Sequence, residues 1–154
     1  METIGSYLTQ DHARCDALFL RASDAVRAAR WGDAWRAMAA FQYALERHLL
    51  IEERIVFPAF ELALGHAVSP TAGMRAEHLR IRAVAQRLSD AVGANDAQGF
   101  VTHAEALLLA VHQHSEKEEG VLYPMIERVL ARRCPDLLGV MRDFGAWDHC
   151  ASAA

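Results

Sequence analysis

The sequence predicts an all-α protein: an antiparallel up-down-up-down four-helix bundle with a short extra helix near the C-terminus. Its 154 residues are 53% hydrophobic and 23% charged, with only four prolines and nine glycines, a composition typical of a helical globular chain. Apolar residues recur at alternating spacings of three and four along four long segments, as on the buried face of an amphipathic helix. Short turns separate these segments, which favours antiparallel neighbours.

The first predicted helix covers about residues 6–30, and His12 falls on its apolar stripe. Trp31 and Gly32 are expected to end it, with Asp33 as the N-cap of the second helix. That helix is predicted from about residue 34 to beyond residue 57, and its stripe ends with His48, Glu52 and Ile55. Pro58 should kink or end it, because proline lacks the N–H that would bond to the carbonyl of Arg54.

The second half of the chain repeats this plan. Ser69 as N-cap and Pro70 as first helical residue open the third helix, which is predicted to reach about residue 92 with His78 on its stripe. The fourth helix is predicted over about residues 97–131, and its stripe passes through the following residues: His114, Glu118, Val121 and Met125. A short helix is predicted over 136–144. We expect one domain, 1–154, with the bundle over 6–131 and the extra helix and tail over 136–154.

An internal repeat organises the sequence. The stretch HLLIEERIVFPAFE at 48–61 returns 66 residues later as HSEKEEGVLYPMIE at 114–127, and the same offset relates His12 to His78. Each half therefore contains a histidine followed, 36 residues later, by His-x-x-x-Glu. The repeated positions carry residue types that bind metals.

Six polar residues occupy stripes that should face the core: His12, His48, Glu52, His78, His114 and Glu118. Burying even a neutral polar group without partners costs about 2–7 kcal/mol, so these residues must be partnered. One interpretation is a core network in which histidines and carboxylates satisfy one another. The shared offset favours metal binding instead, and six imidazole and carboxylate ligands suit two metals bridged by the two glutamates better than one tetrahedral zinc.

The neighbouring residues have less specific roles. Glu53 and Glu119 follow the ligand glutamates and are expected to be exposed charges, with contact to the ligands as the alternative. Phe57 and Tyr123 are expected to cover the metal end of the core. Cys15 is expected to be an inert packed thiol, while the position of His112 turns it away from His114.

Composition also excludes several functions. The net charge is -4 and no basic stripe is present, so we expect no nucleic-acid partner. No secretory signal and no run of eighteen apolar residues occur, so we expect no membrane association. The three cysteines form no CxxC pair, which suits a reduced cytoplasmic location.

With these motifs, the sequence resembles the hemerythrin-like, or HHE cation-binding, domains. The resemblance implies a non-haem centre of two Fe ions inside the bundle, with an oxo or hydroxo bridge and with Glu52 and Glu118 bridging the irons. Oxygen-carrying hemerythrins have a fifth histidine one turn from the first on the third helix, but Met74 and Arg82 stand there in this chain. The set of four histidines and two glutamates is similar to that of bacterial proteins implicated in nitrosative stress and iron-sulfur repair.

The resulting hypothesis is a di-iron protein that binds or senses O2 or NO, or handles iron, in oxidative or nitrosative stress. The resemblance leaves two alternatives. One is a redox enzyme that reduces NO or peroxide with electrons from a partner protein. The other is an iron donor for the repair of a partner's iron-sulfur cluster.

Overall fold

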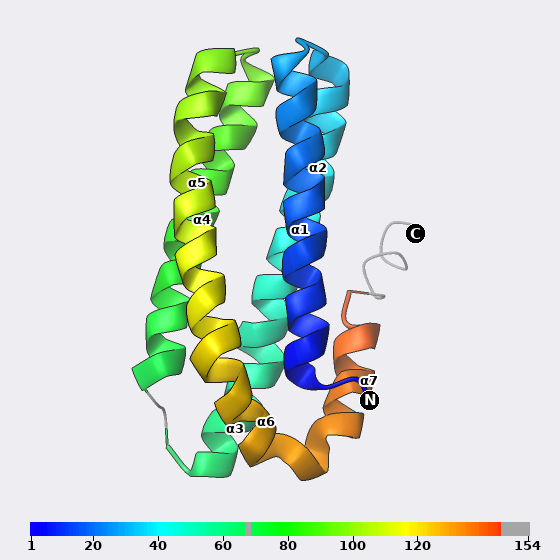
Figure 1. The fold of residues 1–154 in the computed structure, drawn as a ribbon, viewed down its shortest axis with the longest axis vertical. Coiled ribbons are helices and arrows are strands. Elements are labelled where there is room, and N and C mark those ends of the chain that lie inside the picture. The colour runs from blue at the N-terminus through cyan, green and yellow to red at the C-terminus, as the bar shows by residue number, and fades with distance from the viewer. Residues whose placement is uncertain (67–68, 146–154) are drawn as a thin grey trace, which may run out of the picture.

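Four long antiparallel helices form the body of the molecule (Figure 1), as predicted. In this computed structural model, which describes residues 1–66 and 69–145, they are α1 (Ile4–Arg27), α2 (Trp31–Ile51), α4 (Ser69–Gly93) and α5 (Ala97–Lys117). Shorter helices lie at the lower end: α3 (Phe57–Leu64), α6 (Tyr123–Leu130) and α7 (Cys134–Asp143), with a 3-10 turn over Ala131–Arg133. The tail from residue 146 and the predicted capping side chain of Ser69 lie outside the described residues.

The turn between α1 and α2 differs from the prediction. The chain leaves α1 after Arg27 and reverses through Ala29, whose φ of 52° is in the left-handed region. The N-cap of α2 is therefore Arg30, and Asp33 lies within the first turn of the helix, where it accepts hydrogen bonds from Arg30 and Arg36. The sequence suggested a later turn because Gly32 is the residue that ordinarily adopts such a conformation.

The second helix of each repeat half, α2 in the first and α5 in the second, continues into one π-helical turn. These turns cover Glu52–Val56 and Glu118–Leu122. There the backbone N–H of Phe57 bonds to the carbonyl of Glu52, and that of Tyr123 to Glu118, five residues back. The helices therefore continue through the prolines without an abrupt end. A π-turn adds one residue to the turn and so moves the buried face by one position.

This shift corrects the lower half of the predicted stripes. Val121 and Met125, which α-helical spacing placed in the core, are 58% and 38% exposed. Their neighbours Leu122 and Ile126 are buried in their place, at 2% and 0% exposure. In the first half Val56 is likewise fully buried in place of the predicted Ile55.

The core consists of two apolar clusters with a polar layer between them. The upper cluster includes Phe19, Phe41 and Phe100, and the lower one includes Phe60 and Ile126. Along α1, Leu8 belongs to the lower cluster and Cys15 to the upper one, which places His12 between them. The candidate site thus lies inside the bundle, away from both ends.

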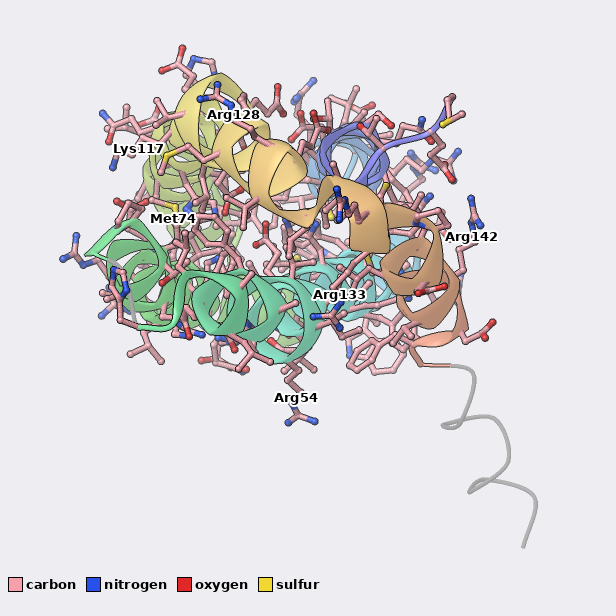
Figure 2. The ribbon with its side chains drawn as sticks, turned by 90° about the horizontal axis from the view of Figure 1, so that it is seen from below. Arg54, Met74, Lys117, Arg128, Arg133 and Arg142 are labelled. Atoms are coloured by element: carbon pink, nitrogen blue, oxygen red, sulfur yellow. The ribbon has the colours of Figure 1, made fainter. Side chains whose placement is uncertain are left out.

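Two glutamates at corresponding positions of the repeat hold the helices together at the lower end. Glu127 on α6 accepts hydrogen bonds from Thr3 and from the backbone N–H of Gly5, while its repeat counterpart Glu61 on α3 accepts from Thr71 at the start of α4. A Cβ on Gly5 would lie 2.6 Å from Glu127 Oε1 and 3.2 Å from Tyr123 Cβ, so a larger residue there would displace the Glu127 carboxylate. Seen from below, α3, α6 and α7 surround this end, and Arg54 extends away from it (Figure 2). None of the helices in the described part of the chain combines the length and apolarity needed to cross a bilayer.

Candidate metal centre

The six predicted ligands lie together in the polar layer. Five are at most 3% exposed, and the side chain of His12 is 10% exposed. Their donor atoms form two groups, each with all atoms within 4.8 Å of one another: Glu52, His78, His114 and Glu118 in one, and His12, His48 and Glu118 in the other. The helices of both halves of the repeat therefore converge on one centre.

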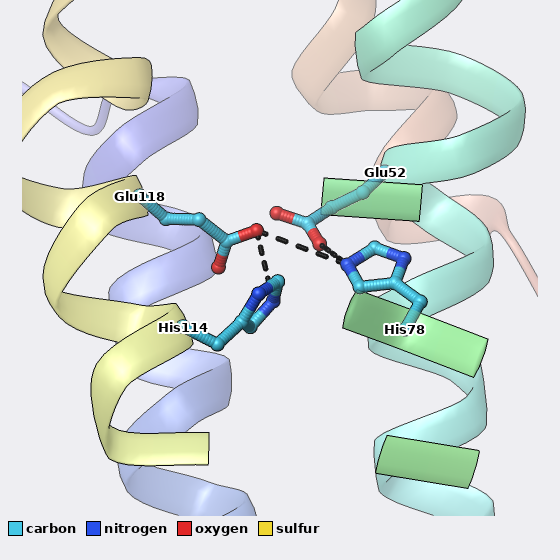
Figure 3. Close-up of side chains that lie close together, drawn as sticks. All are labelled: Glu52, His78, His114 and Glu118. Atoms are coloured by element: carbon cyan, nitrogen blue, oxygen red, sulfur yellow. Dashed lines mark ion pairs between the residues drawn. The ribbon is translucent and has the colours of Figure 1, made fainter. Parts of the chain in front are cut away.

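The two glutamates lie between the two groups of histidines. Glu118 places Oε1 3.0 Å from His114 Nε2 and Oε2 3.2 Å from His12 Nε2. Glu52 Oε2 is 3.3 Å from His78 Nε2 and 3.5 Å from the Nε2 of His48. Figure 3 shows the two carboxylates pointing toward each other from opposite helices, with the His78 and His114 rings beside them. Each carboxylate thus faces one histidine of each group.

Each of the four candidate ligand histidines has a further carboxylate, outside the set of six, beside its Nδ1 atom. Glu53 Oε1 is 2.7 Å from His78 Nδ1, and Glu119 Oε1 is 2.7 Å from His12 Nδ1. Glu77 approaches His114 Nδ1 at 3.0 Å, and Asp11 approaches His48 Nδ1 at a longer 3.8 Å. Such carboxylates fix the ring orientation and leave Nε2 to face the centre.

Glu53 and Glu119 follow the alternative considered for them, contact with the ligands. Each reaches a histidine on a different helix; the Glu53 side chain is 21% exposed, whereas Glu119 is exposed as expected, at 41%, and still contacts His12. Successive residues in the wide π-turn are separated by a smaller angle than in an α-helix, so the residue after the ligand glutamate stays close to the core. The signal available in the sequence was the acid repeated at the offset of 66, next to each ligand.

Tyr123, which was expected to cover the metal end of the core, also brings its hydroxyl group into the centre. Its Oη lies 2.7 Å from Glu52 Oε1 and 3.0 Å from Glu118 Oε2, and 3.3 Å from His12 Nε2. Burial, together with these two carboxylates, raises the pKa of Tyr123 well above its usual value, so the hydroxyl remains a donor. It links carboxylates from the two halves of the repeat.

Without a metal, the buried histidines and Glu118 stabilise each other's charged forms. Burial disfavours protonation of the imidazoles, but nearby carboxylates outweigh it and raise the pKa of His12 to about 9 and that of His78 to about 10. The pKa of Glu118 is held well below its usual value: burial would raise it, but the imidazoles of His114, His12 and His78 within 4 Å of its oxygens outweigh burial. Without a metal, protons therefore supply the positive charge that the carboxylates require.

The buried donor atoms are nevertheless not satisfied by one another. Four of them have no hydrogen-bond partner, namely Glu52 Oε2, His78 Nε2, His114 Nε2 and Glu118 Oε1. His114 Nε2 and Glu118 Oε1 are 3.0 Å apart but lack the angle of a hydrogen bond. A self-satisfied core network would pair these atoms, whereas metal ions would use them. Imidazole nitrogen with carboxylate oxygen is a donor set that suits iron.

Comparison with known proteins identifies the family. The family model described as the hemerythrin HHE cation-binding domain matches residues 3–126, with a second, overlapping match over 70–143. The chain belongs to the hemerythrin HHE family. Searches of curated proteins and of solved structures return no significant match. Membership indicates cation binding, and the His and Glu groups described above are able to hold a metal.

Oxygen-carrying hemerythrins have a fifth histidine one turn from the first on the third helix. In this HHE domain, the two residues one turn from His78 are Met74 and Arg82, and both make other contacts. Met74 packs in the lower core at 6% exposure. Arg82 pairs with Glu46 and, at 2.7 Å, with Glu53, and so neutralises the carboxylate that holds His78. Neither residue adds a donor to the centre.

A small cavity adjoins the histidines of the HHE domain. It has a volume of about 20 Å3 and is bordered by His12, His48 and His114 together with apolar and small side chains, among them Leu49, Ile81 and Val111. Cys15 also borders it, but burial raises the pKa of this thiol to about 12, as expected of a packed, unreactive cysteine. His112 is exposed on the outer side of α5, as predicted.

Proposed function

We propose that the chain is a di-iron protein that binds or senses O2 or NO in oxidative or nitrosative stress. His12 and His48 would hold one iron ion, His78 and His114 the other, and Glu52 and Glu118 would be shared. The unpartnered buried atoms and the carboxylate beside each histidine support this assignment. Bound iron would supply redox-active coordination chemistry with room for one small ligand.

The cavity beside the histidines carries the proposal for a diatomic ligand. Its volume of about 20 Å3 is that of one very small molecule, since a single water requires roughly 10–15 Å3 measured this way. The walls away from the histidines are mainly apolar, which favours a neutral molecule such as O2 or NO over an ion or a polar substrate. We place the protein in the cytoplasm.

The decisive experiment adds NO to the anaerobic ferrous protein and follows its absorption spectrum and the amount of NO bound per chain. We expect saturable binding with a new visible band. Val111→Phe, which fills the cavity without removing a ligand, should slow and weaken binding. Val101→Phe, on the exposed surface of the same helix, should not. Absence of any spectral change in iron-loaded protein would refute gas binding.

Two further measurements on the same iron-loaded protein separate the alternative functions. Sustained consumption of NO or peroxide with an added reductant would indicate a redox enzyme served by a partner protein. Transfer of iron to a metal-free iron-sulfur protein would indicate a donor for cluster repair. Stoichiometric binding without turnover or iron loss supports the proposed role.

A further inference from the structure

The repeat places the six donors symmetrically, but the hydroxyl of Tyr123 has no counterpart. The equivalent residue is Phe57, whose ring stacks on His78 with centroids 6.0 Å apart. Tyr123 Oη instead lies against Glu52 and Glu118, and within 3.3 Å of His12 Nε2. The Tyr123 hydroxyl therefore competes with a metal ion for these carboxylate oxygens, and it does so on the His12 side of the centre.

The two groups of donors differ accordingly. The group around His78 and His114 has four members, because both Glu52 and Glu118 take part. The group around His12 and His48 has three, with Glu118 as its carboxylate; Glu52 Oε2 is 3.5 Å from His48 Nε2 but closer, at 3.3 Å, to His78 Nε2. The second oxygen of Glu52 accepts the hydrogen bond of Tyr123 at 2.7 Å. An ion at the second position must therefore compete with that hydroxyl.

The outer surroundings show the same asymmetry. On the His78 side, Arg82 pairs with Glu53 and helps to cover it. At the offset of 66 the residue corresponding to Arg82 is Asp16, so Glu119 has no such arginine and is 41% exposed. An open groove of about 500 Å3 between α1 and α5 reaches His12 and Glu119, and its other charged lining residues are Asp16, Glu116 and Arg27, so that acids outnumber the base. Of the four histidine side chains, that of His12 is the most exposed, at 10% against at most 3%.

We infer that the two metal positions are inequivalent and fill in order, the His78–His114 position first and the His12–His48 position second, with Tyr123 setting the difference. This inference rests on the proposed di-iron site. The first position is enclosed and offers four donors. The second exchanges its ion through the groove, whose carboxylates attract a cation. The chain therefore has a stable form with a single ion at intermediate iron supply.

The test is an anaerobic calorimetric titration of the metal-free protein with Fe2+. Wild type should bind two ions in two separate steps. His12→Ala should retain the tight step and lose the weak one, whereas His114→Ala should lose the tight step. Circular dichroism of each variant checks that the helices are intact. Binding of two ions in a single step by the wild type would overturn the order.

Tyr123→Phe provides a test that leaves all six donors in place. Without the competing hydroxyl, the second step should strengthen by about tenfold to a hundredfold, the range expected for one hydrogen bond to a charged group. Tyr43→Phe removes a hydroxyl from an exposed face and should change neither step. An unchanged second step in Tyr123→Phe would show that Tyr123 does not set the difference between the two metal positions. Absence of any Fe2+ binding by the wild type would overturn the di-iron proposal together with the order.

Discussion

Raising the pH should destabilise the metal-free protein, because the folded state holds protons on His12 and His78. Their pKa values rise from 6.5 to about 9 and about 10. A histidine whose pKa is higher in the folded than in the unfolded state stabilises the fold fully below its unfolded-state pKa of 6.5. This stabilisation is lost as the pH rises through the pKa of the folded state. At 1.36 kcal/mol per pH unit, His12 alone accounts for about 3 kcal/mol and His78 for about 5 kcal/mol. The two contributions overlap because both rings face Glu118.

We therefore expect the free energy of unfolding to fall by about 3–5 kcal/mol between pH 6.5 and pH 10. Urea unfolding of chelator-treated protein at several pH values, with the slope compared between them, measures this directly. His112→Ala should show the same fall, because this exposed histidine lies outside the centre. Stability that is constant or rises over this range would show that the buried imidazoles are neutral in the folded protein.

Three further predictions concern the site and the fold. Glu52→Ala or Glu118→Ala should abolish binding of the metal pair, while His112→Ala keeps it, as elemental analysis will show; equal loss in all three would refute the ligand assignment. Glu119→Gln should weaken metal binding by about tenfold to a hundredfold in chelator competition, since it removes the carboxylate that orients a ligand ring; unchanged affinity would contradict that role. Ala29→Gly should raise stability by about 0.5–1 kcal/mol by relieving the left-handed backbone at φ 52°, and a lowered melting temperature would contradict this.

The repeat and the periodicity were sufficient to predict the helical bundle and the convergence of its polar residues. His48 and Glu52, four apart on one helix face, could only point the same way, and the offset of 66 imposed the same arrangement on the second half. The predicted stripes failed beyond Glu118, because α-helical spacing cannot anticipate a π-turn. That single extra residue exchanged Val121 for Leu122 in the core.

The outer carboxylates escaped prediction for a different reason. Glu53 and Glu119 bind histidines on other helices, so their partners depend on how the helices pack rather than on any pattern within one helix. The same holds for Tyr123, which contacts carboxylates from both halves of the repeat. Apolar and charged patterns identify which face is buried, but not which side chains meet across it.

The most direct test of the account is the iron content of freshly purified protein from iron-replete cells, measured together with its absorption spectrum. About two irons per chain, with near-ultraviolet charge-transfer bands of a bridged pair, is the predicted result. Protein without iron, or with one weakly held zinc ion, would contradict the account and leave the six buried residues as a core network held together by protons.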